Sequence, residues 1–530
     1  MGKDPDEKPA QGEAPESAPP ASRGVSELWL VAALVAWALG VITLLERTPY
    51  GLDEATARVV LILWSVSDKV PSAIVTLGVP DFRALFLAPA GLLFSGSLLA
   101  GKICTLFVYL AAVVGLHRWF ARSGDSEVPM LASGLLLIAP LAVGLIDQLA
   151  VGPFLLLSLV LGAWADDIYR ATRVRFGGWY FAQLLLCLAL PTLHPAGLAY
   201  PVILGLAWIR EPAPEASQAG IIPGRERTHV LLGVAIATLF GVLLAAGWPH
   251  QVWLENPLTA LPRYLLDFEP QSTVGDSVSL LLGIVLWLAL LAALWFSRAR
   301  WRRDQLARSL VLAWAIAAFC GDASFALLSL VLLLHEGFGL LLRLRLERAA
   351  GFVGQRGVAF AVLTVISTSF LVADRGRYEA LRRGTELSAQ DELIRTLAGE
   401  VQQQVQRAAA SAQPGLLTPE QRARSGPKVA SQWPGRTMIA CRCSTLPLPP
   451  PVDEPSRLAA NLRGIDFVIF DPQDAANRSL ARGFAELGGA EAETVSLQSG
   501  GVLLRLRPAE PNAPQQGPQP APQEGGAGRG

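Results

Sequence analysis

The chain has 530 residues, of which 52% are hydrophobic and only 17% are charged, and its mean hydropathy is +0.40. A soluble chain of this length carries more charge and shorter apolar runs, so the composition predicts an integral membrane protein. The formal net charge is zero, which gives no electrostatic basis for binding nucleic acid.

The two ends of the chain are expected to be disordered tails. Residues 1–25 are rich in Pro, Glu, Asp, Ala and Ser, and residues 509–530 are mostly Pro, Gln, Gly and Ala, so neither can bury a core. Between them we expect a helical membrane region over 26–373 and a small α/β domain over 374–508. The first apolar run, Leu28–Leu45, follows an acidic tail and lacks a small-residue cleavage site, so we interpret it as a retained signal anchor.

About eleven membrane-spanning helices are predicted, because a span needs roughly 20 mostly apolar residues. Suitable runs begin near Leu28, Gly96, Pro129, Gln148, Gly178, Pro195, Val230, Val278, Ser309, Phe325 and Gly357. Three pairs of spans meet at Asp147, His194 and Asp322, and each pair is predicted to be a helical hairpin. Two longer loops, 46–96 and 248–276, are expected on the outer side of the membrane.

Basic residues in the loops set the expected orientation. If the N-terminus lies inside, every inner loop carries Arg, and these residues are Arg118, Arg122, Arg170, Arg173, Arg175, Arg210, Arg225, Arg227, Arg298, Arg300, Arg302, Arg303, Arg308, Arg343, Arg345, Arg348 and Arg356. The outer side then holds only Arg47, Arg58, Lys69, Arg83, Arg263 and Lys102. An odd number of spans places the C-terminal domain on the outer side.

The outer loop 46–96 contains two amphipathic stretches, Asp53–Val66 and Asp81–Phe94, which are split by Pro71 and Pro80. Each stretch is too polar or too short to cross a bilayer. We therefore expect two helices that lie flat in the membrane interface.

Adjacent carboxylates, Asp53 and Glu54, open the first of these helices. One interpretation is structural: Asp53 caps free N–H groups and Glu54 pairs with Arg58 one turn on. The other is catalytic, with a general base that takes a proton from an acceptor hydroxyl. Asp147 has the same two interpretations, because a lone acid in a turn between apolar spans must face water, a cation or a partner. Asp147 is expected on the same side of the membrane as Asp53, which favours the catalytic interpretation.

Basic side chains accompany these acids on the outer side. Lys69, Arg83 and Lys102 either extend to lipid headgroups or bind a lipid phosphate or pyrophosphate, for which Arg and Lys are natural ligands. Lys102 and Arg83 are the preferred phosphate ligands. His194 is held between two prolines in a tight outer turn and is a further candidate, and Asp322 belongs to the same outer layer.

The C-terminal region alternates helical and strand-like runs, which predicts a small α/β domain. Helices are expected over Glu379–Leu397, Glu400–Ala410 and Ala475–Leu487, and strands over Thr437–Cys443, Ile465–Asp471, Thr494–Leu497 and Val502–Leu506. In a strand, Cys441 and Cys443 would share one face, and a disulfide at that spacing would be strained. No spacing among the five Cys resembles a zinc site.

These features together resemble the GT-C superfamily of membrane glycosyltransferases, which includes protein O-mannosyltransferases and aminoarabinose transferases of lipid A. The shared features are an uncleaved first span, an outer loop opening with Asp53 and Glu54, two interfacial helices, Lys102 near the start of the second span, and Asp147 in the next outer loop. The resemblance covers about the first 210 residues in pattern and the rest in architecture. The chain departs from it by lacking a Pro-Pro-rich stretch before the second span and an Asp-X-Asp metal motif. No metal ligand is predicted, and a divalent metal ion stays open as a cofactor.

The resemblance implies an inverting glycosyltransferase of the bacterial inner membrane, with a cytoplasmic N-terminus and a periplasmic C-terminal domain. The donor would be a polyprenyl-phosphate sugar, with its tail among membrane lipids and its phosphate near Lys102 and Arg83. Asp53 would deprotonate the acceptor hydroxyl or stabilise the developing charge on the sugar. The acceptor would be a glycan, lipid or protein. Glu54 and Asp147 complete the predicted catalytic set, and the remaining substrate-binding residues would be Lys69, Arg58 and His194.

Three other functions stay open on the residues alone. A transporter or flippase for a lipid-linked sugar places ionisable groups near the midplane, whereas the charges here are expected at the outer edge. A polysaccharide polymerase or ligase that uses a late outer loop is compatible with His250 and Arg263. A non-enzymatic assembly subunit would use the acids only as helix caps.

Overall fold

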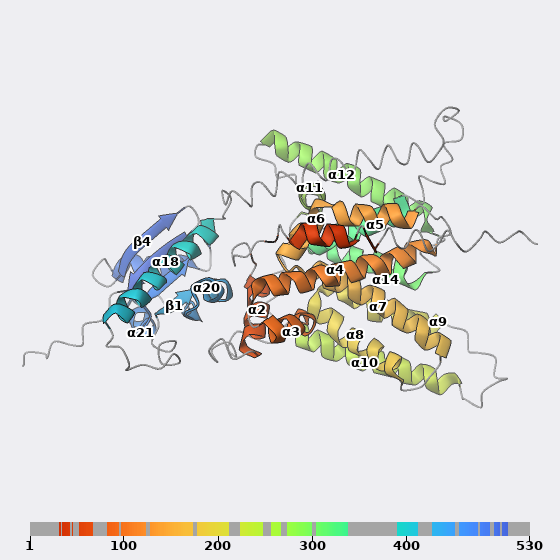
Figure 1. The fold of residues 1–530 in the computed structure, drawn as a ribbon, viewed down its shortest axis with the longest axis horizontal. Helices are drawn as coiled ribbons and strands as arrows, with labels where there is room; N and C mark the ends of the chain where they lie inside the picture. Colours follow the sequence, from red (N-terminus) through yellow and green to blue (C-terminus); the bar gives the residue numbers. More distant parts are fainter. Residues whose placement is uncertain are drawn as a thin grey trace, which may run out of the picture.

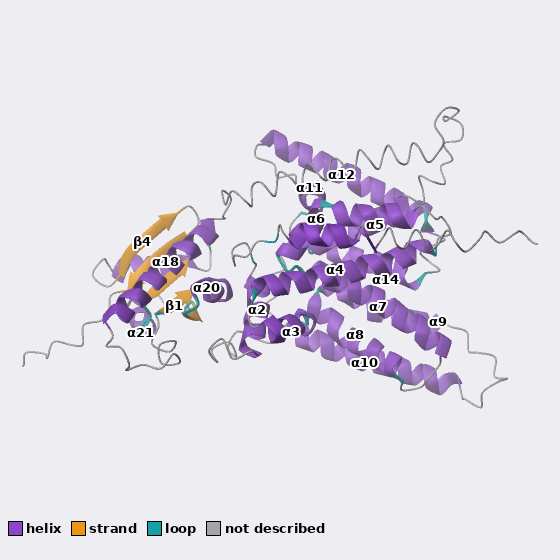
Figure 2. Ribbon diagram, in the orientation of Figure 1, coloured by secondary structure: helices purple, strands orange, loops and turns teal. Residues whose placement is uncertain are grey.

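In a computed structural model of the chain, a bundle of apolar helices stands beside a small α/β domain (Figure 1), and strands occur only in that domain among the described residues (Figure 2). The structure describes residues 31–32, 34–42, 45, 52, 54–66, 82–94, 97–122, 128–172, 177–210, 223–246, 256–266, 273–298, 304–337, 389–411, 427–450, 455–474, 477–487, 492–498 and 501–506.

The bundle confirms the predicted class, a mostly helical membrane protein. Its elements are α2 (Glu54–Val66), α3 (Arg83–Phe94), α4 (Leu98–Ala121), α5 (Val128–Ile138), α6 (Pro140–Asp147), α7 (Val151–Thr172), α8 (Gly178–Leu193), η2 (Pro195–Leu198), α9 (Ala199–Arg210), α10 (Pro223–Ala246), α11 (Pro257–Leu266), α12 (Thr273–Phe296), α14 (Gln305–Ala317), α15 (Ala323–Leu332) and η3 (Leu333–Gly337). Four helices in the described part are long and apolar enough to cross a membrane, in α4, α7, α10 and α12, and shorter apolar helices accompany them. The predicted number of eleven spans is not established, and the run from Gly357 lies outside the described residues.

The predicted turns between paired helices occur where the sequence places them. Asp147 ends α6, His194 follows α8, and Asp322 precedes α15. The two stretches of the loop 46–96 are helices as expected, α2 and α3. The run predicted as one span from Pro129 is instead divided at Ala139, because Pro140 begins a new helix and restricts the backbone before it.

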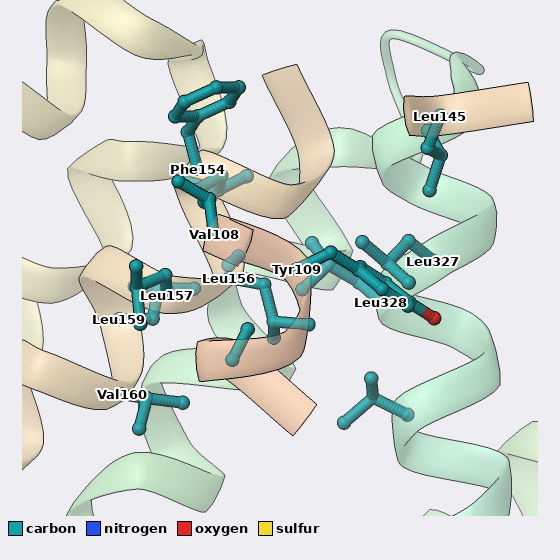
Figure 3. Close-up of a cluster of buried hydrophobic side chains, with 14 of the residues drawn as sticks. Val108, Tyr109, Leu145, Phe154, Leu156, Leu157, Leu159, Val160, Leu327 and Leu328 are labelled. Atoms are coloured by element: carbon teal, nitrogen blue, oxygen red, sulfur yellow. The ribbon is translucent and has the colours of Figure 1, made fainter. Parts of the chain in front are cut away.

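The core of the bundle lies between α4, α6, α7 and α15 (Figure 3). Tyr109 is fully buried there and its hydroxyl donates to the carbonyl of Leu136. Gly115 allows α4 and α7 to pack closely, because a Cβ at this position would lie 2.5 Å from Val160. Small residues commonly permit such close approach between helices in membranes.

Two helices of the bundle leave much apolar surface exposed. More than half of each of several large side chains on α10 and α12 is exposed, namely Leu239, Phe240, Leu281, Leu288 and Trp295. Apolar surface of this extent fits contact with lipid chains rather than with water.

The C-terminal domain contains one five-stranded sheet in the order β2-β1-β3-β5-β4. The strands are β1 (Lys428–Ser431), β2 (Ser444–Pro447), β3 (Phe467–Phe470), β4 (Ala492–Gln498) and β5 (Gly501–Leu506). Strand β1 is parallel to both β2 and β3, whereas β5 is antiparallel to β3 and β4. The predicted strands around β3, β4 and β5 are confirmed.

Helices cover both faces of this sheet. The helices of the domain are α18 (Ala389–Ser411), α20 (Pro434–Cys441), α21 (Pro455–Asn461) and α22 (Arg478–Leu487). Leu393 and Leu397 of α18 pack on one face, and Leu458 of α21 and Phe484 of α22 pack on the other. The two helices predicted up to Leu397 and from Glu400 are one helix, because a single Gly is tolerated inside it.

The strand predicted over Thr437–Cys443 is wrong. Most of this segment is helix α20, which begins with Pro434 at its first position, where proline's fixed φ favours a helix. The helix ends at Cys441 and is followed by Arg442, which has a left-handed φ of 54°. Cys441 and Cys443 therefore do not share a strand face, and both are free thiols.

Candidate functional site

A buried ion pair joins α4 to the end of α6. Lys102 lies about one turn inside α4 and its side chain is 0% exposed, while the side chain of Asp147 is 17% exposed. The Lys102 Nζ atom lies 2.7 Å from Asp147 Oδ1. A buried ammonium group needs an opposite charge in a medium of low dielectric, and Asp147 supplies one from a separate hairpin turn.

The turn after Asp147 has an unusual backbone. Leu149 has a φ of 49° and is fully buried. The N–H of Ala150 bonds to the carbonyl of Leu145, and that of Leu149 to Ile146, which is a helix-ending pattern that usually places glycine at the left-handed position. A leucine there costs about 1–2 kcal/mol, so surrounding contacts must hold the turn in place.

Two contacts hold this turn. Arg83 of α3 is 2% exposed, and its Nη1 atom donates to the carbonyl of Leu149 and to Thr56 Oγ1 of α2, each at 2.9 Å. Gly101 of α4 faces the same turn, because a Cβ there would lie 3.2 Å from the Leu149 side chain. Arg83 and Lys102 therefore meet around one turn, and Arg83 also connects that turn to α2.

Glu54 of α2 contacts the C-terminal domain. Its Oε1 atom accepts from the N–H of Gly435 at 2.8 Å, and its Oε2 atom accepts from the N–H of Arg436 at 3.1 Å. The expected pair with Arg58 is present, with Nε 3.0 Å from Glu54 Oε1. Burial raises the pKa of Glu54, while the two amides and Arg58 act in the opposite direction.

His194 joins two hairpin turns. Its Nε2 atom lies 3.0 Å from Asp322 Oδ2, and its Nδ1 atom accepts from the N–H of Ala196. Asp322 also caps α15 by accepting from the N–H of Phe325. Both ring nitrogens of His194 are therefore engaged within the protein.

The structure thus brings together three of the predicted residues, Lys102, Asp147 and Arg83. Glu54 and Arg58 lie at the contact with the C-terminal domain. Asp53, Lys69 and His250 lie outside the described residues. Five further residues at these contacts were not predicted from the sequence, namely Thr56, Gly101, Leu149, Gly435 and Arg436. Only Gly101, as the glycine immediately before Lys102, carried a local signal.

Other charged groups gather at the opposite end of α4 and α7. Arg122 pairs with Asp167 at 3.1 Å, and both side chains are about half exposed. Asp166 is fully buried, faces Arg170, and accepts from Gln183 at 3.2 Å. Among the described residues, no group of three or more His, Cys, Asp or Glu side chains is placed to hold a metal ion.

No family model matches the chain, and no curated protein matches it significantly. ArnT from Cupriavidus metallidurans in the apo state is 16% identical with a TM-score of 0.48, over 91% of this chain and 98% of that one. The same protein bound to undecaprenyl phosphate is 15% identical with a TM-score of 0.48, over the same shares. The oligosaccharyltransferase of Archaeoglobus fulgidus in its apo form is 12% identical with a TM-score of 0.47, over 84% of this chain and 69% of that one.

Over most of its length the chain is similar in overall arrangement to ArnT and to the archaeal oligosaccharyltransferase.

Proposed function

We propose that this protein transfers a sugar from a polyprenyl-phosphate donor to a hydroxyl group of an acceptor on the outer side of the bacterial inner membrane. The observation that supports it most is the buried Lys102–Asp147 pair, in a turn that Arg83 also binds. An acid and two basic groups meet there at one end of an apolar helical bundle.

The two basic side chains suit a lipid phosphate. An ammonium and a guanidinium group are the usual protein ligands of phosphate oxygens, and the guanidinium offers several donors in a fixed plane. A donor carried on a polyprenyl tail keeps that tail in lipid and presents its phosphate at the end of the bundle. Asp147 balances the charge of Lys102 in the protein without donor, and the phosphate would share that role when the donor binds.

The carboxylates suit the reaction at the sugar. The acceptor oxygen forms a bond to the anomeric carbon while the bond from that carbon to the phosphate oxygen breaks. The hydroxyl proton passes to a carboxylate, for which we propose Asp53, and polyprenyl phosphate leaves with the bonding electrons. Attack opposite the leaving phosphate inverts the anomeric carbon. Asp147 would hold Lys102 and the donor in place.

The proposed orientation places the N-terminus in the cytoplasm and the C-terminal domain in the periplasm. Acceptors of three kinds fit this arrangement: an envelope glycan, a lipid or a protein. The arginine-rich inner loops and the position of Lys102 at the opposite end of α4 support this orientation.

The test is a transfer assay with the full chain in lipid nanodiscs. Radiolabelled polyprenyl-phosphate hexoses and pentoses are supplied with envelope glycan, lipid and protein fractions, and both the labelled product and the released polyprenyl phosphate are measured. Lys102→Met, Asp147→Asn and Arg83→Gln should each lower transfer by about 10²-fold or more. Arg122→Gln and Asp167→Asn are the matched controls, because they alter an exposed pair at the other end of the bundle.

The controls should keep transfer within about twofold of the unaltered protein, as expected for an exposed ion pair. Full transfer by both Lys102→Met and Asp147→Asn would refute the proposed site. Movement of the labelled lipid across the bilayer with its sugar unchanged, and no transfer, would instead support a transporter.

A further inference from the structure

The first turn of α20 is capped by a residue from the other part of the molecule. Proline at the first position has no N–H, so the first amides available in this helix are those of Gly435 and Arg436, and each donates to one oxygen of Glu54. Trp433, at the cap position, makes no side-chain hydrogen bond to the helix. A carboxylate at a helix N-terminus also interacts favourably with the helix dipole.

The fit around Glu54 is tight at a glycine of α20. A Cβ at Gly435 would lie 3.0 Å from Glu54 Oε1, 3.2 Å from Oε2 and 3.2 Å from Arg58 Cγ. These distances are shorter than most Cβ contacts, so a larger residue at this position would displace the Glu54 and Arg58 side chains from their places beside α20. The contact between Glu54 and the first turn of α20 is called the Glu54–α20 contact below.

The domain side of this contact is anchored. The amide of Arg436 binds Glu54, and the guanidinium of the same residue donates to Asp391 at 2.6 Å and to Gln390 at 3.0 Å, both in the first turn of α18. Helix α18 packs on the central sheet through Leu393 and Leu397. The first turn of α20 is therefore linked through α18 to the hydrophobic core of the domain.

The bundle side leads to the proposed donor site. Thr56, on the same helix as Glu54, accepts from Arg83, and Arg83 also donates to the carbonyl of Leu149 in the turn after Asp147. Figure 1 shows α20 beside α2 at the end of the bundle, and the hydrogen bonds of Glu54 join the two helices. Hydrogen bonds at Glu54 and at Arg83, joined through helix α2, thus connect the C-terminal domain to the turn after Asp147, the partner of Lys102.

We propose that Glu54 is a positioning residue, which docks the C-terminal domain on α2 and through Thr56 and Arg83 keeps the donor site in its productive geometry. Both carboxylate oxygens bind amides of α20, so Glu54 acts through that helix rather than on the substrate. The docking itself is independent of the enzyme's activity, whereas its effect on transfer rests on the proposed function.

Hydrogen exchange of the full chain in nanodiscs tests the docking without any sugar donor. Glu54→Ala and Gly435→Ala should each speed exchange of the Gly435 and Arg436 region by about tenfold or more, since each disrupts hydrogen bonds to a charged group. In Gly435→Ala the measured amides are those of residues 435 and 436. Gly399→Ala is the matched control, because a Cβ there meets nothing within 4 Å. Glu486→Gln, an exposed acid on α22, is the second control.

Transfer kinetics then separate positioning from catalysis. Gly435→Ala leaves the Glu54 carboxylate intact, so a positioning role predicts that Gly435→Ala and Glu54→Ala lower kcat by similar factors and that the double variant is no worse than either. Glu54→Gln keeps one accepting oxygen and should be intermediate. The two control variants should keep the unaltered rate.

Two results would overturn the inference. One is unchanged exchange in both Glu54→Ala and Gly435→Ala, which would mean that the contact does not form. The other is normal transfer by Gly435→Ala, despite faster exchange, beside an inactive Glu54→Ala, which would make Glu54 a catalytic residue. If the unaltered protein transfers no sugar, the proposed function fails, and the exchange result still decides whether the domain docks through Glu54.

Discussion

Removing Asp147 should destabilise the protein more than removing Lys102. The ammonium group of Lys102 is fully buried, whereas Asp147 is 17% exposed and has access to water. Breaking a buried ion pair by removing one partner costs about 3–5 kcal/mol, and the exposure of Asp147 places Asp147→Asn at the lower end, near 3 kcal/mol. Lys102→Met leaves the more exposed member and should cost about half as much.

The double variant Lys102→Met/Asp147→Asn distinguishes this pair from two independent losses. Its cost should fall below the sum of the single costs by about 2 kcal/mol, because coupled charges in contact are not additive. Unfolding in mixed micelles of increasing SDS fraction gives these free energies. The same cycle at Arg122 and Asp167, which are about half exposed, should give a coupling of about 0.2–1 kcal/mol. Equal coupling in the two cycles would refute the reasoning from burial.

Three further experiments test the packing of helices in the bundle, the reactivity of the thiols in the C-terminal domain and the contact between two hairpin turns. Gly241→Ala should cost about 1–3 kcal/mol of unfolding free energy in the same assay, because its Cβ would lie 2.4 Å from a backbone carbonyl oxygen of α8. Gly205→Ala is the control and should cost nothing, because its Cβ would meet nothing within 4 Å. Equal costs for the two variants would contradict this reasoning. The hydrogen bond between the two C-terminal thiols lowers the pKa of Cys443 and raises that of Cys441, so iodoacetamide should modify Cys443 first at pH 7, as mass spectrometry would detect. Asp322→Ala removes both an ion pair and a helix cap and should cost about 1–3 kcal/mol of unfolding free energy.

Elements with a strong local pattern were predictable from the sequence. Helices α2 and α3 follow from apolar periodicity between prolines, and β3 follows from a short run of buried apolar residues. Lys102 and Asp147 were expected on one side of the membrane because each lies at the end of a long apolar run. Their ion pair satisfies the requirement that a charge in such a place must have a partner.

Elements set by tertiary contact were not predictable. Thr437 and Ile439 favour a strand locally, yet the segment is helical, because Pro434 starts a helix whose first amides bind Glu54. Glu54 and Gly435 are separated by 381 positions, and no local pattern links them. The expected pair of Glu54 with Arg58 is present, but the same carboxylate also caps a helix of the C-terminal domain, which the sequence did not predict.

The distribution of charge along α4 and α7 argues for chemistry at one membrane edge. Lys102 and Arg122 lie roughly 30 Å apart along α4, at about 1.5 Å per residue, which matches the thickness of a bilayer's hydrocarbon core, about 30 Å. Asp147 ends α6, just before the start of α7, and Asp166 lies in the last two turns of α7. The residues of α7 from Val151 to Ala165 include no ionisable side chain. A transporter needs ionisable groups along its path through the midplane, whereas these two helices present them at the ends, where a phosphate on a lipid tail would meet an acceptor in water.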